Sequence, residues 1–406
     1  MHTLGHKLDH LHRRVSVRLF GDDYGRVDGT CRLPPEWLVL CINNFCNLKC
    51  RMCDVGLGDH GTVFWANLIG DDPRNMTLDL LNTILGQAKA FRPRPAIGLA
   101  FTEPMIHPKI LDFCRTIVAQ GFYCEMTSNG TMLPRHAEKL VESGLDDLVI
   151  SIDGPPEVHD RVRGRARTFE QLSSGLERLN AAKRRLGRDR PRVRFSFTIT
   201  DANYNHILEF IQAVEPLEPA EIMISHLNFI SDRMAEVHNA QYDGDLSVVR
   251  SNLGDIQPEE MPVATLWEEL QRVKAYVRDR SADPARRFPR VSITPDVPDV
   301  DHLQTYYRDH LTFVGGRNCT DPWKLMMIKT DGTVIPAHGR CYNFPVGNVT
   351  EQTLPDIWNG PRFLQLRSTL KGAGGTLPAC ARCCGVIGKK PSSATAGETQ
   401  RAATIG

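Results

Sequence analysis

Two groups of cysteines are the residues whose types and spacing could carry chemistry in this chain of 406 residues. Cys46, Cys50 and Cys53 stand near the start with the spacing C-x3-C-x2-C. Three thiolates on one short loop can hold three irons of a cubane cluster, leaving the fourth iron open to a substrate or cofactor. A structural zinc site is the alternative, but it needs four closed ligands, and Cys41 could supply the fourth only from within a predicted strand.

The second group lies near the end of the chain. Cys380 and Cys383 form a C-x2-C pair, which is typical metal-ligand spacing, and Cys319 and Cys341 would complete a four-thiolate site. Four sulfurs suit either an iron–sulfur cluster or a structural zinc ion. Cys384 follows the pair directly and is spare or an alternate ligand.

Composition and charge bear on the compartment and the partners of this protein. The twelve cysteines occur without a secretory signal, so a disulfide framework is disfavoured and we predict a cytoplasmic protein. The net charge of +1 and the lack of a long apolar run give no reason to expect a membrane partner. Residues 161–194 hold twelve basic residues against three acids, but without interleaved aromatic residues a solvated helix face is favoured over a nucleic-acid site.

Alternating apolar segments must position the first cysteines. Strand-like runs alternate with helical patterns from residue 37 to about residue 230. The predicted strands are 37–42, 96–101, 122–127, 147–152, 192–199 and 221–227, and the predicted helices are 77–91, 109–120, 134–144, 168–186 and 204–214. This order predicts βαβ units, and hence an α/β fold with a partial (β/α)6 barrel of parallel strands. Active sites in such folds lie at the carboxyl ends of the strands, where the first cysteine loop begins.

The remaining segments suggest five parts. In the last cysteine-bearing part, two apolar runs flank Asp331-Gly332, a signal for a β-hairpin. The parts are an N-terminal extension (1–34), the partial barrel (35–230), a bridging or lid region (231–318), a small cysteine-rich hairpin and helix module (319–388) and a disordered polar tail (389–406).

The first cysteine loop resembles the signature of the radical S-adenosylmethionine superfamily. The resemblance continues after the second predicted strand, where AFTEP stands in place of the family's Gly-Gly-Glu-Pro, and after the fourth, with SIDGPPEVHDRVRG. Met52 replaces the usual aromatic residue, and Phe101 and Thr102 replace the two glycines. The resemblance implies a [4Fe-4S] cluster on Cys46, Cys50 and Cys53, with S-adenosylmethionine bound to its open iron.

The same resemblance implies which residues surround that cofactor. Glu103 would face its ammonium group, and Arg163 would reach its carboxylate. Without the family, Ser151 and Asp153 would be read as helix-capping or turn residues. The cofactor-binding residues that it implies are Glu103, Asn129, Ser151, Asp153, Arg163 and Ser196.

The C-terminal part resembles the SPASM or twitch extension of such enzymes. The matching features are the cysteine before the hairpin, Gly347-Asn348, the IWN run at 357–359 and the closing C-x2-C pair. Ala337 stands where the common pattern has a cysteine, and Cys341 is the expected substitute. The resemblance implies one auxiliary [4Fe-4S] cluster, with ligands Cys319, Cys341, Cys380 and Cys383.

The function implied is radical chemistry. Such an enzyme takes one electron from a reductant such as flavodoxin or ferredoxin, cleaves S-adenosylmethionine, and abstracts hydrogen from an unactivated carbon. Because some 36 residues precede the first predicted strand, too few for a leader-binding module, we expect a small carbohydrate-like or aminocyclitol-like substrate undergoing oxidation or epimerisation. Epimerisation would need a hydrogen donor, for which Cys384 is the first candidate. The alternatives are a peptide-modifying maturase and a non-catalytic iron–sulfur or zinc protein.

Overall fold

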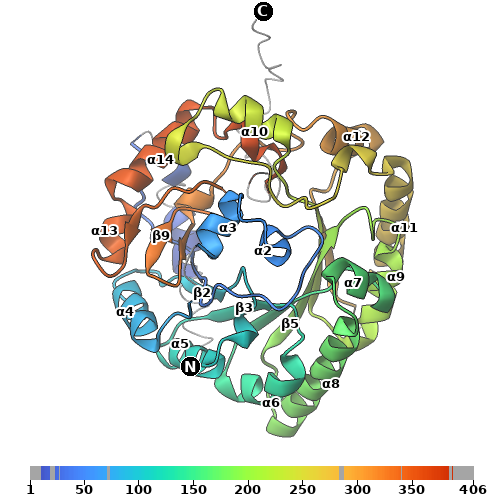
Figure 1. Ribbon diagram of the computed structural model, residues 1–406. Helices are drawn as coiled ribbons and strands as arrows, with labels where there is room; N and C mark the ends of the chain where they lie inside the picture. Colours follow the sequence, from blue (N-terminus) through green and yellow to red (C-terminus); the bar gives the residue numbers. More distant parts are fainter. Residues whose placement is uncertain are drawn as a thin grey trace, which may run out of the picture.

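The protein is described by a computed structural model that covers residues 11–18, 23–26, 28–70, 74–282, 288–339, 341–383 and 386. Its described strands form a single sheet in the order β10-β9-β8-β1-β2-β3-β4-β5-β6-β7. The outer helices surround this sheet, and α2 (Asp54–Leu57) and α3 (Val63–Leu68) lie inside the ring (Figure 1). The predicted tail and Cys384 lie outside the described residues.

Six parallel strands form the predicted partial barrel, which is confirmed. They are β1 (Trp37–Leu40), β2 (Ala96–Leu99), β3 (Cys124–Ser128), β4 (Asp147–Ser151), β5 (Arg192–Ile199) and β6 (Glu221–His226). Each pairs in parallel with the next. The residues of β2 are all buried, as expected where helices cover a parallel sheet.

Helices connect these strands and cover the outside of the sheet. They are α4 (Leu78–Ala88), α5 (Ile110–Ala119), α6 (Leu133–Ser143), α7 (Pro156–Arg163), α8 (Thr168–Leu186) and α9 (Ile207–Val214). Apolar residues recur at helical spacing, so each helix presents one buried stripe to the core. On α5 the stripe comprises Ile110, Phe113, Cys114 and Ile117.

The region expected as a bridge contributes to the same sheet. β7 (Arg290–Thr294) pairs in parallel with β6, extending the barrel beyond the six predicted strands. The helices α10 (Asp232–Asn239), α11 (Val263–Ser281) and α12 (Val300–Arg308) belong to this region. Packing of α11 against α9 and α12 makes it part of the helical wall.

The C-terminal module joins the opposite edge of the sheet. β8 (Leu325–Ile328) pairs in parallel with β1, and turns at Gly332 into the antiparallel β9 (Thr333–Ile335), confirming the predicted hairpin. The short β10 (Gly347–Asn348) follows. α13 (Leu354–Trp358), α14 (Pro361–Gly372) and the 3-10 helix η7 (Pro378–Arg382) complete the described module.

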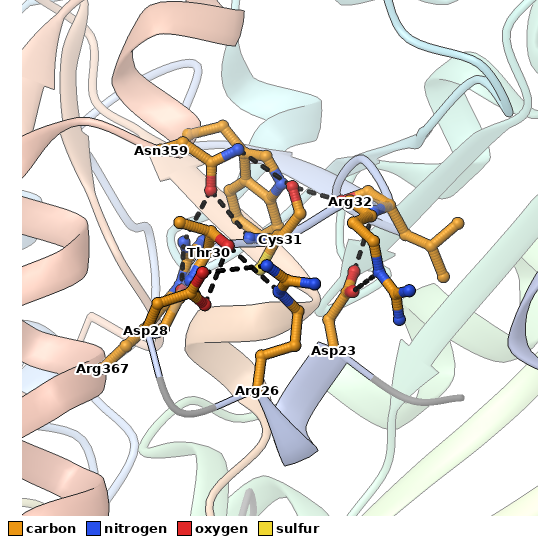
Figure 2. A network of polar contacts seen from close by, with 11 residues as sticks. Asp23, Arg26, Asp28, Thr30, Cys31, Arg32, Asn359 and Arg367 are labelled. Atoms are coloured by element: carbon orange, nitrogen blue, oxygen red, sulfur yellow. Dashed lines mark hydrogen bonds and ion pairs between the residues drawn. The ribbon is translucent and has the colours of Figure 1, made fainter. Parts of the chain in front are cut away.

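A polar network ties the segment before β1 to this module (Figure 2). The Asn359 side chain accepts a hydrogen bond from the Cys31 amide at 2.8 Å and donates one to the Cys31 carbonyl at 2.9 Å. The fully buried Arg367 donates to the carbonyl of Gly29 and to Asn359, both at 3.2 Å. The last residue of the IWN run therefore anchors the N-terminal segment.

Candidate active site

A cavity of about 1230 Å³ lies at the carboxyl ends of the barrel strands. It is lined by all three cysteines of the first group and by five of the six residues expected around the cofactor. These five are Glu103, Asn129, Ser151, Arg163 and Ser196. Ser151 and Ser196 are paired in register on adjacent strands, so both reach the same face of the sheet.

Two glycines press against the loop that carries the first cysteines. Gly164, at the end of α7, and Gly254 both have a left-handed backbone, with φ of 67° and 55°. A Cβ atom on Gly164 would stand 2.2 Å from the Lys49 carbonyl oxygen, and one on Gly254 would stand 2.2 Å from that of Arg51. The backbone on either side of Cys50 is therefore in close contact with the two glycines, and neither glycine position leaves room for a side chain.

A buried carboxylate fixes the other end of this loop. Asp54, directly after Cys53, accepts hydrogen bonds from the Ser251 hydroxyl at 2.6 Å and from the Asn252 amide at 2.7 Å. Asn252 has a left-handed φ of 61° and donates through its side chain to the carbonyl of Asn228. Both asparagines line the cavity, so the cysteine loop and this part of the wall are held together.

Cys46 and Cys50 are protonated thiols unless a metal displaces the proton. Cys46 is accessible at the rim, yet the surrounding protein still raises its pKa to about 12 through desolvation. Burial likewise raises the pKa of Cys50 to about 11, against the opposing effect of Arg163. Metal ions bind the thiolate form, so binding here would release protons.

Arg163 is shared between a carboxylate and a cysteine. Its Nη2 forms an ion pair with Asp153 Oδ2 at 2.7 Å, and its Nη1 lies 3.8 Å from Cys50 Sγ. Although burial opposes the charge, Asp153 and Cys50 raise the pKa of Arg163 above its usual value. Asp153 was expected to line the site, but it lies behind the wall, fully buried, and also accepts from the Thr198 amide at 2.8 Å.

Glu103 occupies the wall beside β2 and β3. Its carboxylate accepts from the Met105 amide, the Ser128 hydroxyl and the Asn129 amide at 2.9, 2.8 and 2.7 Å. Burial raises its pKa despite these donors. Phe101, which replaces a family glycine, keeps a left-handed φ of 85°, a conformation that costs free energy for a residue with a side chain.

The cysteines of the second group lie close to one another. The Cys383 thiol hydrogen-bonds to Cys341, which by itself lowers the pKa of Cys341. Burial and the neighbouring Cys319 and Cys380 outweigh this effect, so the pKa of Cys341 is raised. Tyr342 donates or accepts a hydrogen bond with Cys380 at 3.3 Å, and burial raises the pKa of its phenol. The residues expected to bind the auxiliary cluster are therefore neighbours in space.

A smaller cavity of about 450 Å³ lies beside the second group. It is lined by Cys341, Cys380 and Cys383, and it shares Asn228 and His338 with the larger cavity. Sequence reasoning missed His338, which stacks on Phe64 with ring centroids 6.3 Å apart. Its place directly after Ala337, where the family pattern has a cysteine, is the one signal that could have drawn attention to it.

His226, at the end of β6, belongs to the outer wall. Its Nδ1 hydrogen-bonds with the Tyr307 hydroxyl at 2.8 Å, and complete burial lowers its pKa to about 3. The side chain that precedes it, Ser225, pairs in register with Thr198, a residue of the cavity wall. Because side chains alternate along a strand, His226 points to the opposite face.

Comparison with known protein families decides the identity. Residues 40–214 match the radical SAM superfamily, and residues 319–384 match SPASM, an iron–sulfur cluster-binding domain. The chain is a radical SAM enzyme with a SPASM domain. This membership confirms the resemblance seen in the motifs.

Relatives of this radical SAM enzyme act on varied substrates. The tungsten-containing aldehyde ferredoxin oxidoreductase cofactor-modifying protein of Pyrococcus furiosus is 25% identical, covering 86% of this chain and 87% of the relative. Pre-heme d1 synthase of Dinoroseobacter shibae is 24% identical, covering 94% and 85%. Streptococcus suis SuiB bound to its precursor peptide SuiA has the same fold, with a TM-score of 0.55, 15% identity and coverage of 86% and 71%.

The cofactors of this radical SAM enzyme follow from its domains. They are a [4Fe-4S] cluster, S-adenosylmethionine and the auxiliary iron–sulfur binding of the SPASM domain. The donor sets fit, because thiolates are the ligands that iron–sulfur clusters require. As placed, no three His, Cys, Asp or Glu side chains within the described ranges converge on a single metal ion. None of the helices in these ranges has the length and apolar character to cross a membrane.

Proposed function

We propose that this enzyme removes a hydrogen atom from an unactivated carbon of a small polar molecule held between its two cysteine groups. The observation that carries the proposal is that Asn228 and His338 line both cavities. A molecule held beside these two residues would face Cys46, Cys50 and Cys53 on one side and the second group on the other. The proposal deepens the family assignment by placing the substrate.

Each part of the wall has a role in this proposal. Cys46, Cys50 and Cys53 would hold the radical-generating cluster, and Cys319, Cys341, Cys380 and Cys383 one auxiliary cluster. Bound together, the first cluster and S-adenosylmethionine supply a 5′-deoxyadenosyl radical. The Glu103 carboxylate and the side chains of Asn129, Ser151 and Ser196, which line the larger cavity, would orient the cofactor. The Glu103 carboxylate suits an ammonium group, because a charged acceptor and a charged donor form a strong hydrogen bond.

The chain would also protect the reactive carbon from water. Phe64 and Phe101 form an apolar part of the wall, and His338 packs against both rings, at 6.3 and 5.1 Å between centroids. Such a wall limits side reactions and fixes the position of a bound molecule. Ordering of the substrate, rather than binding strength, would then select the carbon that reacts.

For the substrate we propose a carbohydrate-like or aminocyclitol-like molecule that is oxidised or epimerised. The support is the hydrogen-bonding character of the wall at Ser196, Thr198, Asn228 and Asn252. A second candidate is a heme-type or metal-cofactor precursor. It is favoured by the names of the two relatives that span most of the chain and by the apolar residues Phe229 and Ile230 in the smaller cavity.

One experiment tests both levels of this proposal. The reconstituted enzyme is incubated anaerobically with S-adenosylmethionine, dithionite and panels of aminocyclitols, sugars, heme precursors and peptides in deuterated buffer. A true substrate increases the release of 5′-deoxyadenosine. When the reacting carbon of that substrate carries deuterium, the deuterium appears in the 5′-deoxyadenosine. Solvent deuterium in the product indicates epimerisation. Deuterium transfer from a peptide alone would contradict the small-molecule proposal but leave the radical chemistry intact.

The triple variant C46A/C50A/C53A tests the placement of the radical cluster, and Cys124→Ala is its matched control. Cys124 is buried in β3 and lies outside the cavity, so its loss should leave 5′-deoxyadenosine release in place. The triple variant should release none. Release at the normal rate from the triple variant would contradict the placement of the radical cluster.

A further inference from the structure

We propose that Tyr342 donates a hydrogen bond to the sulfur of Cys380 and thereby sets the reduction potential of the auxiliary cluster. This inference rests on the proposed role of Cys380 as a cluster ligand. Tyr342 acts through that ligand, so it is a positioning residue rather than a catalytic one. It follows Cys341 directly in the sequence, but its hydroxyl points to Cys380, which lies on η7.

The contact itself is short and enclosed. Tyr342 Oη lies 3.3 Å from Cys380 Sγ, and the tyrosine is 6% exposed. A metal-bound cysteine is a thiolate, which has no proton to donate. The phenol must then be the donor, and burial removes water as a competing partner.

Two residues from other elements hold Tyr342 in this orientation. The His238 ring, on α10, stacks on its ring with centroids 5.8 Å apart and an angle of 18°. Asn67, on α3, donates from its side-chain nitrogen to the carbonyls of Gly339 and Tyr342 at 2.8 and 3.2 Å. Both ends of the residue are therefore fixed, so the hydroxyl has little freedom to leave the sulfur.

His238 also fixes the acceptor. Its Nε2 donates to the Leu246 carbonyl at 2.8 Å, which leaves Nδ1 as the acceptor for the Ala379 amide at 3.4 Å. Ala379 immediately precedes Cys380. A single histidine thus positions the tyrosine that donates the hydrogen bond and the backbone beside the sulfur that accepts it. Residues that hydrogen-bond to metal ligands, or hold those ligands in place, tune the metal site that they surround.

The expected consequence is electrostatic. Reduction adds one electron to a cluster, and the negative charge spreads onto the ligand sulfurs. A hydrogen bond to a sulfur stabilises the reduced form more than the oxidised form, and such bonds are among the factors that set cluster potentials. The proton stays on the phenol in both states, so no proton transfer accompanies the electron.

The test is a redox titration of the full-length holoenzyme followed by EPR spectroscopy. The auxiliary signal is assigned with the C46A/C50A/C53A variant, which retains the second cysteine group. In Tyr342→Phe, which keeps the stacked ring and removes only the hydroxyl, the ratio of reduced to oxidised auxiliary cluster at a fixed potential should fall about tenfold. For a one-electron couple this is a shift of about 59 mV. The matched control is Tyr307→Phe, which removes an equally buried hydroxyl that bonds His226, and its ratio should not change.

The outcomes separate this inference from the proposed function. An unchanged ratio in Tyr342→Phe with full iron content would overturn the role of Tyr342 alone. A wild-type chain without iron in its second cysteine group would overturn both that role and the cluster assignment. If Tyr342→Phe does not load iron, wild-type protein containing 3-fluorotyrosine, a stronger donor, should show a raised ratio. An unchanged ratio there would equally overturn the proposal.

Discussion

Arg163 stands 3.8 Å from the sulfur of Cys50 while its guanidinium is ion-paired with the fully buried Asp153. This relationship joins α7, the loop after β4 and the first cysteine loop in one charged contact. It also explains why Asp153 lies behind the cavity wall, because its oxygens are engaged by Arg163 and by the backbone of Thr198.

Replacement of Arg163 by Met should strongly destabilise the fold. The Asp153 carboxylate would stay buried without its cationic partner, which costs about 3–5 kcal/mol. Urea unfolding followed by circular dichroism measures the loss. The control is Arg167→Met, where an exposed arginine pairs with the exposed Glu170, so the loss of stability should be much smaller. An equal loss of unfolding free energy in the two variants would show that the buried ion pair contributes no more to stability than the exposed one.

Substitution of Gly164 by Ala should prevent assembly of the first cluster. The new Cβ would stand 2.2 Å from the Lys49 carbonyl oxygen, so the loop that carries Cys50 must move. Gly187, at the end of α8, gives the matched control because it has a similar φ of 59° and open space around it.

Gly187→Ala should therefore cost only the left-handed backbone penalty of about 1 kcal/mol and keep its iron. Iron per chain after reconstitution, together with the thermal unfolding midpoint, separates the two variants. Full iron and normal 5′-deoxyadenosine release in Gly164→Ala would refute the importance of this close approach.

Iron content should reflect two clusters. Four irons in each give about eight per reconstituted chain, and Cys319→Ala combined with Cys341→Ala should leave about four. Metal analysis and Mössbauer spectroscopy provide the measurement. A wild-type chain with about four irons and one zinc ion would instead assign the second group to structural zinc.

Acid should destabilise the enzyme in part through His226. Burial lowers its folded-state pKa to about 3, below its unfolded value, so the unfolded chain takes up the proton first. The stability is therefore present above about pH 6.5 and is lost as the pH falls toward 3. Between pH 7 and pH 5.5 this histidine alone should cost about 1 kcal/mol.

His226→Asn should reduce this pH dependence by the same amount. The comparison uses the slope of the unfolding free energy with pH, so a constant loss of stability in the variant cancels. A slope in His226→Asn equal to the wild-type slope would mean that folding does not lower the pKa of His226.

The sequence predicted the barrel well because its strands are short, apolar and separated by regular helices. The predicted limits of β5 and α8 agree with the structure at both ends. β7 was missed because RVSIT, which alternates β-branched apolar and polar residues, runs directly into the proline- and aspartate-rich PDVPDVD and therefore resembles part of a connector. Its pairing with β6 is a long-range contact that periodicity does not report.

The sequence pointed to residues expected to contact a cofactor, and it did not point to the residues that support them. The cysteines, Glu103 and Arg163 have recognisable motifs. His338 and Tyr342 have none, because their positions depend on how the hairpin folds against the barrel. Asp153 shows the reverse error, since a motif residue was expected in the wall but its burial and its partner place it one layer behind.

The pairing of β8 with β1 has a practical consequence for anyone dividing this chain. Four residues of each strand are in register, from Trp37 opposite Leu325 to Leu40 opposite Ile328. A cut before the C-terminal module therefore passes through a hydrogen-bonded sheet rather than a linker, and exposes an apolar strand edge on both fragments. Such edges promote aggregation, so chimeras should exchange the hairpin together with the strand it lies against.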